Sequence, residues 1–305
     1  MKILLATMKP FNPVALKIVT DVAENAGHQM VFLEQYTDIS ELVAAVSDVD
    51  ALIVRSDKVT KEVLDSALKL KIVVRAGAGY DNIDLQSCTA RNIVAMNTPG
   101  QNSNAVAELA FLMMLYQARL AFTGRSGSEL RGKKIGFHAF GNVGKYMAEI
   151  ANGFGMDTYA FDPFIEEKTI KGAGVKVCSS TRELYSKCQY VSLHMPANSS
   201  TIKTIGYDIL KLMPVNPILL NTARKELIDE DGLLRIFEER DDLKYLSDVA
   251  PDCKPVFEEK YQGRFFFTEK KMGAQTKEAN INALVAAAHQ IVDFFETGNE
   301  KFRVN

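Results

Sequence analysis

Short runs rich in valine and isoleucine alternate along this chain with longer segments of helical period. A strand that is apolar on both faces has to be covered by helices on both faces, which is what βαβ units build around a parallel sheet. The alternation therefore predicts an α/β fold with doubly wound parallel sheets. The expected strands occupy residues 2–7, 30–34, 51–55, 71–76 and 93–97 in a first series, and 134–139, 157–162, 174–177, 190–195, 218–222, 243–249 and 264–268 in a second series.

Two long helical segments rich in apolar residues bound the second series and suggest two domains. They span residues 101–122 and 277–298. A chain of 305 residues, 47% of them hydrophobic, is long enough to build two separate cores. We expect one domain to comprise residues 1–100 and 277–305, because the last helix has a broad apolar face to bury, and the other to comprise residues 101–276.

The composition of the chain limits the kinds of molecule that it is expected to bind. The formal net charge of −2 offers no global attraction to nucleic acid or to a membrane surface, so the expected partner is a small molecule. The longest apolar run, residues 109–116, falls far short of the roughly 20 residues that a membrane span requires. The four cysteines form no CxxC pair and do not cluster with the four histidines, so we expect no metal site and a cytoplasmic location.

The segment 134–162 carries the strongest functional signal, because a strand, a glycine turn, a helix and a second strand ending in an acid follow one another. Gly141 allows the backbone to approach a pyrophosphate, and Gly144 lets the helix pack close to the strand. The helix N-terminus presents free N–H groups and the positive end of the helix dipole. Asp162 can accept hydrogen bonds from both ribose hydroxyls and repels a 2′-phosphate, so the pattern favours NAD over NADP as cofactor.

One position departs from the dinucleotide-binding pattern, because Ala139 replaces its first glycine. An alanine there predicts a negative φ and a slightly relaxed turn. A glycine-rich match without its surroundings would be as consistent with a plain tight turn as with a dinucleotide site. The flanking strand, helix and acid are what favour a dinucleotide site.

Eight short motifs occur in a fixed order along nearly the whole chain. They are ALIVRS, VRAGAGYDNID, NTPGQNSNAVAEL, the turn from Ala139 to Gly144 together with Asp162, VSLHMP, NTARKELIDEDGL, SDVAP and KMGAQTKEAN. In sequence and order these motifs resemble the D-2-hydroxyacid dehydrogenase family, and within it the short-type D-3-phosphoglycerate dehydrogenases that lack C-terminal regulatory domains. The resemblance implies a Rossmann-like NAD-binding domain inserted into a flavodoxin-like substrate domain, and a homodimer formed through the cofactor domain.

The resemblance also assigns residues to the cofactor. Asp248 corresponds to an aspartate that accepts a hydrogen bond from the nicotinamide carboxamide, and His194 lies in a segment that lines the cofactor site without being catalytic. The residues that the resemblance places at the cofactor are Gly141, Asn142, Val143, Gly144, Asp162, Pro163, His194, Met195, Pro196, Thr222, Ala223, Asp248, Gly273 and Ala274.

Arg224, in the NTAR motif, resembles the arginine that binds the substrate carboxylate and keto oxygen in the family. A planar guanidinium suits this task because its fork of donors can hold an α-keto or α-hydroxy acid in one orientation. The alternative is a structural arginine that pairs with Glu226 or Asp229.

A second group of residues follows strands of the first series and is expected to hold the rest of the substrate. In the family, the loop after VVRAG gives backbone N–H groups to the substrate carboxylate; otherwise it is a plain strand-to-helix turn. Arg55 and Arg75 end two expected strands and concentrate positive charge for a phosphate group, or are solvated strand-end charges. The expected substrate-binding residues are Arg55, Ser56, Lys58, Arg75, Ala76, Gly77, Ala78 and Gly79.

The catalytic histidine of the family, which a glutamate supports, is replaced here by Lys271, and no glutamate is in register after SDVAP. Reduction of a keto acid needs an acid near the forming alkoxide, and the reverse oxidation needs a base. Lys271 can be both if burial and the like charge of Arg224 lower its pKa from ~10.4 toward the working pH. The adjacent Lys270 is expected to be solvated, and whether Asp252 or another group supports Lys271 stays open.

These expectations combine into NAD-dependent interconversion of 3-phospho-D-glycerate and 3-phosphohydroxypyruvate, the first step of serine biosynthesis. A glyoxylate or hydroxypyruvate reductase is the alternative among enzymes. A chain that binds NAD(H) with little turnover and controls protein association, similar to the C-terminal-binding-protein corepressors, is the alternative of another class.

Overall fold

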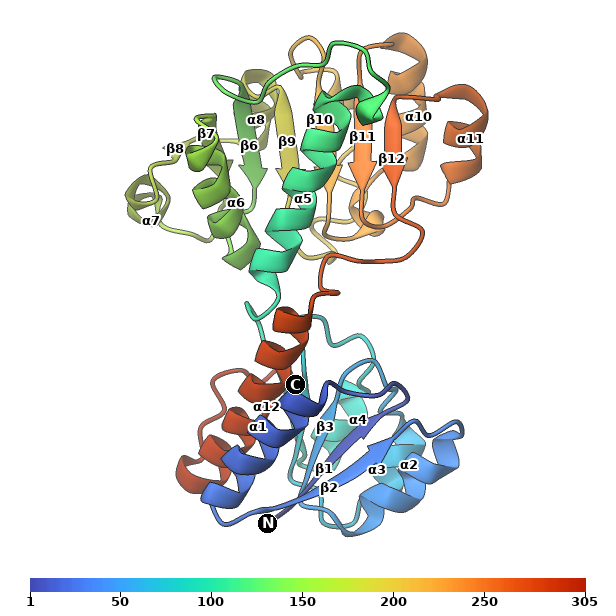
Figure 1. The fold of residues 1–305 in the computed structure, drawn as a ribbon, viewed down its shortest axis with the longest axis vertical. Helices are drawn as coiled ribbons and strands as arrows, with labels where there is room; N and C mark the ends of the chain where they lie inside the picture. Colours follow the sequence, from blue (N-terminus) through green and yellow to red (C-terminus); the bar gives the residue numbers. More distant parts are fainter. The chain divides into compact units, whose positions relative to one another are not determined.

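The computed structural model describes residues 1–305, which divide into two compact units (Figure 1). Unit 1 comprises residues 1–102 and 276–305, and unit 2 comprises residues 103–275. The chain therefore leaves unit 1 once and returns to it through its last helix. None of the helices combines the length and the apolar character that a membrane crossing demands.

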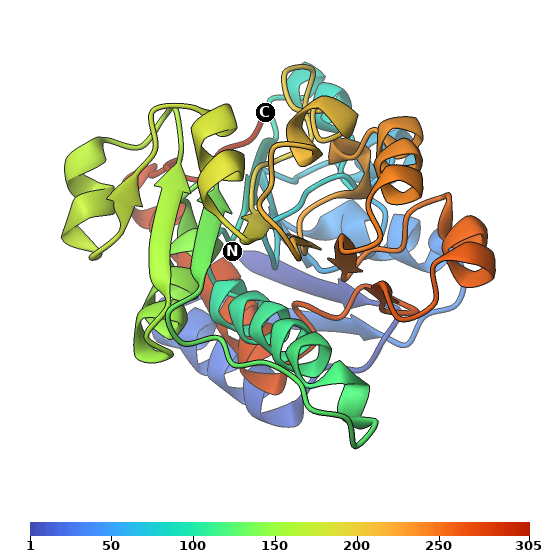
Figure 2. The ribbon, with the colours of Figure 1, turned by 90° about the horizontal axis from the view of Figure 1, so that it is seen from above.

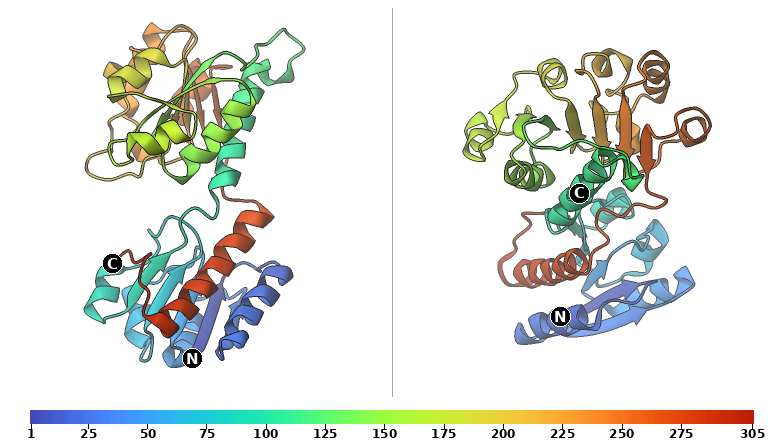
Figure 3. Two further views of the ribbon diagram at one scale, coloured as in Figure 1. Left: turned by 90° about the vertical axis from the view of Figure 1, so that its left-hand side faces the viewer. Right: turned by 45° about the horizontal axis from the view of Figure 1, so that its top comes forward.

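Unit 1 is built on a five-stranded parallel sheet with the strand order β2-β1-β3-β4-β5, which is the flavodoxin-like doubly wound order. Helices α1 and α12 lie side by side on one face of this sheet and bury a cluster of aliphatic residues there (Figures 1 and 3). Helices α2, α3 and α4 cover the other face. The strands are β1 (Lys2–Thr7), β2 (Gln29–Glu34), β3 (Ala51–Val54), β4 (Ile72–Arg75) and β5 (Val94–Asn97), and the helices are α1 (Pro13–Asn25), α2 (Ile39–Ala45), α3 (Lys61–Ser66), α4 (Leu85–Ala90) and α12 (Lys277–Thr297).

Unit 2 contains a seven-stranded parallel sheet with the order β12-β11-β10-β9-β6-β7-β8. Helices α5, α6 and α7 cover one face, and α8 to α11 cover the other (Figure 2). The strands are β6 (Lys134–His138), β7 (Asp157–Phe161), β8 (Lys176–Val177), β9 (Tyr190–Leu193), β10 (Ile218–Asn221), β11 (Lys244–Ser247) and β12 (Phe265–Phe267). The helices are α5 (Ser103–Ala118), α6 (Asn142–Gly153), α7 (Glu167–Gly172), α8 (Thr181–Lys187), α9 (Tyr207–Leu210), α10 (Glu230–Glu239) and α11 (Lys254–Lys260).

The predicted α/β class with two doubly wound parallel sheets is confirmed, and a strand forms within each expected segment. One expected helix is shorter than its sequence suggested. The segment 101–122 is helical only as far as Ala118, because Leu120, Ala121 and Phe122 have φ values of 52°, 52° and 57°. A right-handed helix cannot continue through a left-handed turn, so the apolar pattern overestimated the length of the helix.

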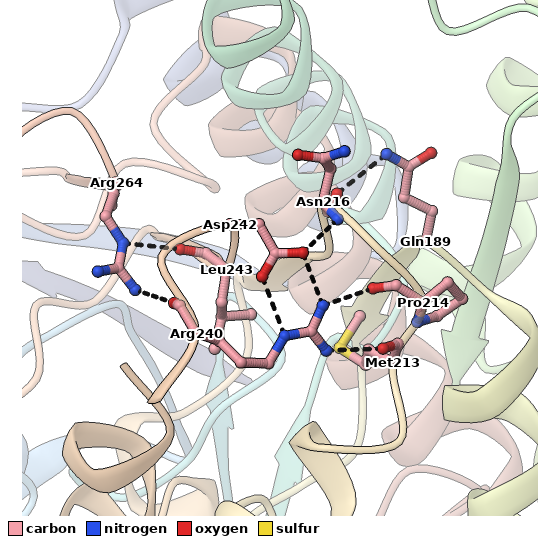
Figure 4. Close-up of polar contacts among 8 residues, drawn as sticks. All are labelled: Gln189, Met213, Pro214, Asn216, Arg240, Asp242, Leu243 and Arg264. Carbon is pink, nitrogen blue, oxygen red and sulfur yellow. Dashed lines mark hydrogen bonds and ion pairs between the residues drawn. The ribbon is translucent and has the colours of Figure 1, made fainter. Parts of the chain in front are cut away.

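The amino ends of β10 and β11 are tied together by Arg240 (Figure 4). Its guanidinium donates to Asp242 through Nε (3.0 Å) and Nη2 (2.7 Å), and to the carbonyls of Met213 (2.7 Å) and Pro214 (2.8 Å). Asp242 also accepts the backbone N–H of Asn216 at 2.7 Å. This network lies at the amino edge of the sheet. Ligands of doubly wound sheets bind at the opposite, carboxyl edge.

Candidate functional site

In doubly wound sheets, ligands bind beyond the carboxyl ends of the strands, where the strand order reverses. In unit 2 this reversal lies between β6 and β9, and in unit 1 between β1 and β3. The turn from Ala139 to Gly144 follows β6, and His194 follows β9. The glycine turn and His194, two of the predicted cofactor segments, thus lie at this position.

The glycine turn after β6 leaves space at the start of α6. A Cβ on Gly144 would lie 2.8 Å from the carbonyl oxygen of Ala139, so only glycine allows this close contact between helix and turn. A Cβ on Gly141 would meet no atom within 4 Å. No side chain caps the first N–H groups of α6. This open, positively polarised helix end fits a pyrophosphate.

Ala139 does not have the negative φ expected from its side chain, because its φ is +77°. The strand has to turn sharply into α6 while the N–H of Ala139 donates to the carbonyl of Phe161 at 2.9 Å. Packing of Gly144 against the Ala139 carbonyl holds the same conformation. The turn therefore keeps the geometry of a glycine at a cost of about 1 kcal/mol.

Asp162, at the end of β7, supports this turn directly. Its carboxylate accepts the backbone N–H of Phe140 at 2.7 Å through one oxygen and that of Phe164 at 2.8 Å through the other. Each carboxylate oxygen can accept a further hydrogen bond, so Asp162 can still receive ribose hydroxyls. Next to it, Pro163 is exposed, as is Asn142 at the start of α6, while Val143 is half-buried.

Two buried polar atoms lie at the same carboxyl edge without a hydrogen-bond partner. They are Nε2 of His194 and Oγ1 of Thr222. The residues preceding them, Leu193 and Asn221, are paired in register on the neighbouring strands β9 and β10. Burial lowers the pKa of His194 to about 3, so its imidazole is neutral at physiological pH. Buried polar groups are normally satisfied, and a bound ligand is one way to satisfy these two.

Arg224 and Lys271 come together on one carbonyl oxygen. Nη1 of Arg224 donates to the carbonyl of Ala223 at 3.0 Å, and Nζ of Lys271 donates to the same oxygen at 3.1 Å. Because these residues lie 47 positions apart in the chain, only the fold of unit 2 places the two cations side by side. A guanidinium and an ammonium that converge in this way can bind a carboxylate and an adjacent oxygen.

The burial expected for Lys271 is absent, because its side chain is exposed. The residue lies in the loop after β12, where Glu269, Lys270 and Met272 are exposed as well.

Asn221 holds the Arg224 segment and was missed by the sequence analysis. This fully buried side chain accepts the N–H of Ala223 at 3.0 Å and donates to the carbonyl of Arg224 at 2.9 Å and to the hydroxyl of Tyr245 at 3.2 Å. A polar residue that ends an otherwise apolar strand was the available signal. The conformation of residues 222–224 thus depends on the side-chain amide of Asn221.

Asp248 holds the loop that carries Lys271. Its carboxylate is fully buried and accepts the backbone N–H groups of Met272 and Gly273, each at 2.7 Å, and the hydroxyl of Thr268 at 3.1 Å. A Cβ on Gly273 would lie 3.0 Å from the same carboxylate. The Asp248 carboxylate therefore accepts hydrogen bonds that hold this loop. The nicotinamide carboxamide expected from the resemblance would be an additional partner.

The loop after β11 contains Asp252, which forms an ion pair with Lys225 at 2.6 Å. Glu230, in the first turn of α10, accepts the backbone N–H groups of Asp252 (2.8 Å) and Cys253 (2.7 Å). Glu230 thus holds the backbone of this loop, and Asp252, the candidate support for Lys271, pairs with Lys225.

In unit 1, Arg55 and Arg75 are brought together at the carboxyl edge. Nε of Arg75 donates to the carbonyl of Arg55 at 2.9 Å. The guanidinium of Arg75 lies against Gly77, where a Cβ would overlap Nη1. Gly77 also has a φ of +146°, so its backbone conformation favours glycine, and a side chain there would displace the Arg75 guanidinium. Of the other predicted residues, Ser56 and Lys58 are exposed, Ala76 is buried, and Ala78 and Gly79 are half-buried.

Residues 4–305 match the model of the D-isomer-specific 2-hydroxyacid dehydrogenase catalytic domain. The chain is 33% identical to D-3-phosphoglycerate dehydrogenase of Methanocaldococcus jannaschii over 92% of its own length and 55% of the relative. It thus spans about half the length of the phosphoglycerate dehydrogenases of that type that it matches. It is also 33% identical to glyoxylate reductase of Thermococcus litoralis, over 83% of this chain and 82% of that enzyme.

Among solved structures, the NAD⁺-bound 3-phosphoglycerate dehydrogenase of Entamoeba histolytica is similar, with a TM-score of 0.88 and 47% identity over 100% of this chain and 98% of that one. The family model covers all of the chain except its first three residues. The chain therefore belongs to the D-isomer-specific 2-hydroxyacid dehydrogenase family.

Proposed function

We propose that this protein is an NAD-dependent oxidoreductase that interconverts 3-phospho-D-glycerate and 3-phosphohydroxypyruvate, the first step of serine biosynthesis. The observation that carries the proposal is the convergence of Arg224 and Lys271 on the carbonyl of Ala223. The relatives named phosphoglycerate dehydrogenase support the choice of substrate.

Unit 2 is proposed to bind the cofactor. The open start of α6 beyond Gly141 would receive the pyrophosphate, and Asp162 would accept the ribose hydroxyls and disfavour a 2′-phosphate. When bound there, the nicotinamide of NAD would supply the hydride acceptor for the hydroxy acid and, in its reduced form, the hydride donor for the keto acid. The other cofactor residues are those proposed from the sequence, including His194, Thr222 and Asp248.

In this proposal, Arg224 orients the substrate and Lys271 moves its proton. The guanidinium holds the carboxylate and the oxygen at C2. During reduction, Nζ of Lys271 gives a proton to the oxygen that becomes the hydroxyl, and during oxidation it takes that proton back. The Ala223 carbonyl, which accepts from both cations, keeps the two groups directed to one place.

For unit 1, we propose two groups of substrate-binding residues. The backbone from Ala76 to Gly79 would donate N–H groups to the carboxylate, and Arg55, Ser56, Lys58 and Arg75 would hold the phosphate. The placement of Arg75 across Gly77 supports this assignment, because it puts a guanidinium beside the proposed carboxylate loop.

The test is a steady-state assay of NADH oxidation by the purified protein with 3-phosphohydroxypyruvate, hydroxypyruvate and glyoxylate. We expect the highest kcat/KM with the phosphorylated acid. The likeness to the glyoxylate reductase of Thermococcus litoralis makes preference for glyoxylate the second candidate. Tight NADH binding without turnover of any of the three acids would instead support the NAD(H)-sensing protein.

A further inference from the structure

A buried carboxylate lies in the loop after β3, which is proposed to bind the substrate phosphate. Asp57 is 2% exposed, although it lies between Ser56 and Lys58, which are exposed. It follows β3, one of the two strands between which the strand order of this sheet reverses. A buried carboxylate is costly unless donors surround it, so its partners explain why it is there.

Donors from three loops reach this one side chain. Oδ1 of Asp57 accepts the N–H of Met8, after β1, at 2.8 Å and the hydroxyl of Tyr36, after β2, at 2.9 Å. Oδ2 accepts the N–H of Arg55, after β3, at 3.3 Å. The Asp57 carbonyl in turn accepts from Nδ2 of Asn82, after β4, at 2.7 Å. The loops after four adjacent strands are thus joined at a single residue.

These bonds determine how the neighbouring residues are presented. With the Asp57 side chain turned inward, Ser56 and Lys58 are left at the surface on either side of it. Arg55 is held by its own N–H to Asp57, and its carbonyl accepts from Arg75. Burial lowers the pKa of Arg55, and the nearby Asp57 charge opposes that shift, which favours the charged guanidinium that a phosphate requires.

We propose that Asp57 is a positioning residue that holds Arg55, Ser56 and Lys58 in the arrangement that selects a phosphorylated acid over its unphosphorylated counterpart. The inference rests on the proposed function, because it deepens the assignment of this loop to the substrate phosphate. Asp57 itself does not contact the phosphate, since its carboxylate is buried and carries the same sign of charge.

The test compares Asp57→Asn and Tyr36→Phe with the unchanged protein. The asparagine keeps the size of the side chain but replaces one accepting oxygen by a donor, and the phenylalanine removes the hydroxyl that donates to Oδ1. We expect both variants to raise KM for 3-phosphohydroxypyruvate about five- to tenfold. The kcat for this substrate, the KM for hydroxypyruvate and the Kd for NADH should stay within about twofold, because those interactions are made elsewhere.

Val46→Ala serves as a control for general destabilisation. Val46 is fully buried in the same core cluster as Tyr36 but precedes β3, at the amino edge of the sheet. This variant should lower stability and leave the ratio of the two KM values unchanged. If Asp57→Asn and Tyr36→Phe behave like Val46→Ala, or lower the KM of the phosphorylated acid, the inference is wrong.

The kinetic results distinguish an incorrect role for Asp57 from an incorrect substrate. If the unchanged protein prefers 3-phosphohydroxypyruvate and both variants keep that preference, the role of Asp57 is refuted while the substrate stands. If the unchanged protein shows no preference for the phosphorylated acid, the substrate proposal is refuted, and the selectivity assigned to Asp57 falls with it.

Discussion

Buried polar side chains anchor the backbone segments that carry both cations of the proposed catalytic pair. The Arg224 segment is bonded on both sides to the buried amide of Asn221, and the loop after Lys271 is bonded to the buried carboxylate of Asp248. Such anchoring fixes where the flexible side chains start, which matters because proton transfer depends on alignment within about 0.5 Å.

Replacement of Lys271 by alanine should lower kcat by roughly 10²- to 10⁴-fold, the range expected for loss of a general acid–base group. The Kd for NADH should stay nearly the same. Lys270→Ala is the matched control, because this exposed neighbour makes none of the contacts described for Lys271, and it should keep its turnover. Steady-state kinetics and fluorescence titration of NADH measure both quantities, and equal rates for the two variants would contradict the assignment.

Gly77→Ala should weaken binding of the keto acid, because the added methyl group would displace the guanidinium of Arg75. Gly27→Ala is a control for backbone strain alone, since Gly27 also has a positive φ but nothing lies within 4 Å of its missing Cβ. Both variants should lose about 1 kcal/mol or more of stability. Only Gly77→Ala should raise KM, and an equal KM in both would show that the contact with Arg75 is irrelevant to substrate.

At the scale of single elements, strain is concentrated at the start of α6. Ala139→Gly should relieve the positive φ and stabilise the protein by about 1 kcal/mol in urea unfolding. Gly144→Ala should instead destabilise it, because its methyl group would lie 2.8 Å from a backbone carbonyl. A destabilised Ala139→Gly variant would mean that the alanine methyl group contributes packing that outweighs the strain.

The Arg240 network makes the stability of unit 2 depend on pH. The hydrogen bond from Arg240 lowers the pKa of Asp242, and burial only partly opposes the shift. A lowered pKa in the folded state means that the stabilisation is present above the unfolded pKa of ~3.9 and is lost as the pH falls through the folded value. Asp242→Asn should therefore unfold with a weaker pH dependence below about pH 4 than the unchanged protein, as measured by urea midpoints.

At the scale of the whole molecule, we propose a homodimer formed through unit 2. Leu112 on α5 is 59% exposed and Phe122 is 71% exposed, so two large apolar side chains of this unit are accessible to a partner. Phe122→Asp and Leu112→Asp should shift the protein toward monomer in light scattering. Leu68→Asp, at an 83% exposed position in unit 1, should leave the assembly unchanged. A monomeric unchanged protein would refute the proposal.

The sequence by itself determined the α/β class and showed the central strands most clearly, because burial on both faces forces continuous apolar runs that are visible in one dimension. It also pointed to Arg224, Lys271 and the glycine turn. It overestimated the helix before Leu120 and missed the positive φ of Ala139, since apolar patterns carry no information on backbone handedness.

Only the tertiary structure decided which side chains meet. Three features join residues that are distant in the chain. They are the Ala223 carbonyl that accepts from Arg224 and Lys271, the hydrogen bonds of Asp248 to the loop of Lys271, and the junction of four loops at Asp57. The reason is physical: parallel strands bring their carboxyl ends to one edge, so loops separated by whole βαβ units become neighbours there.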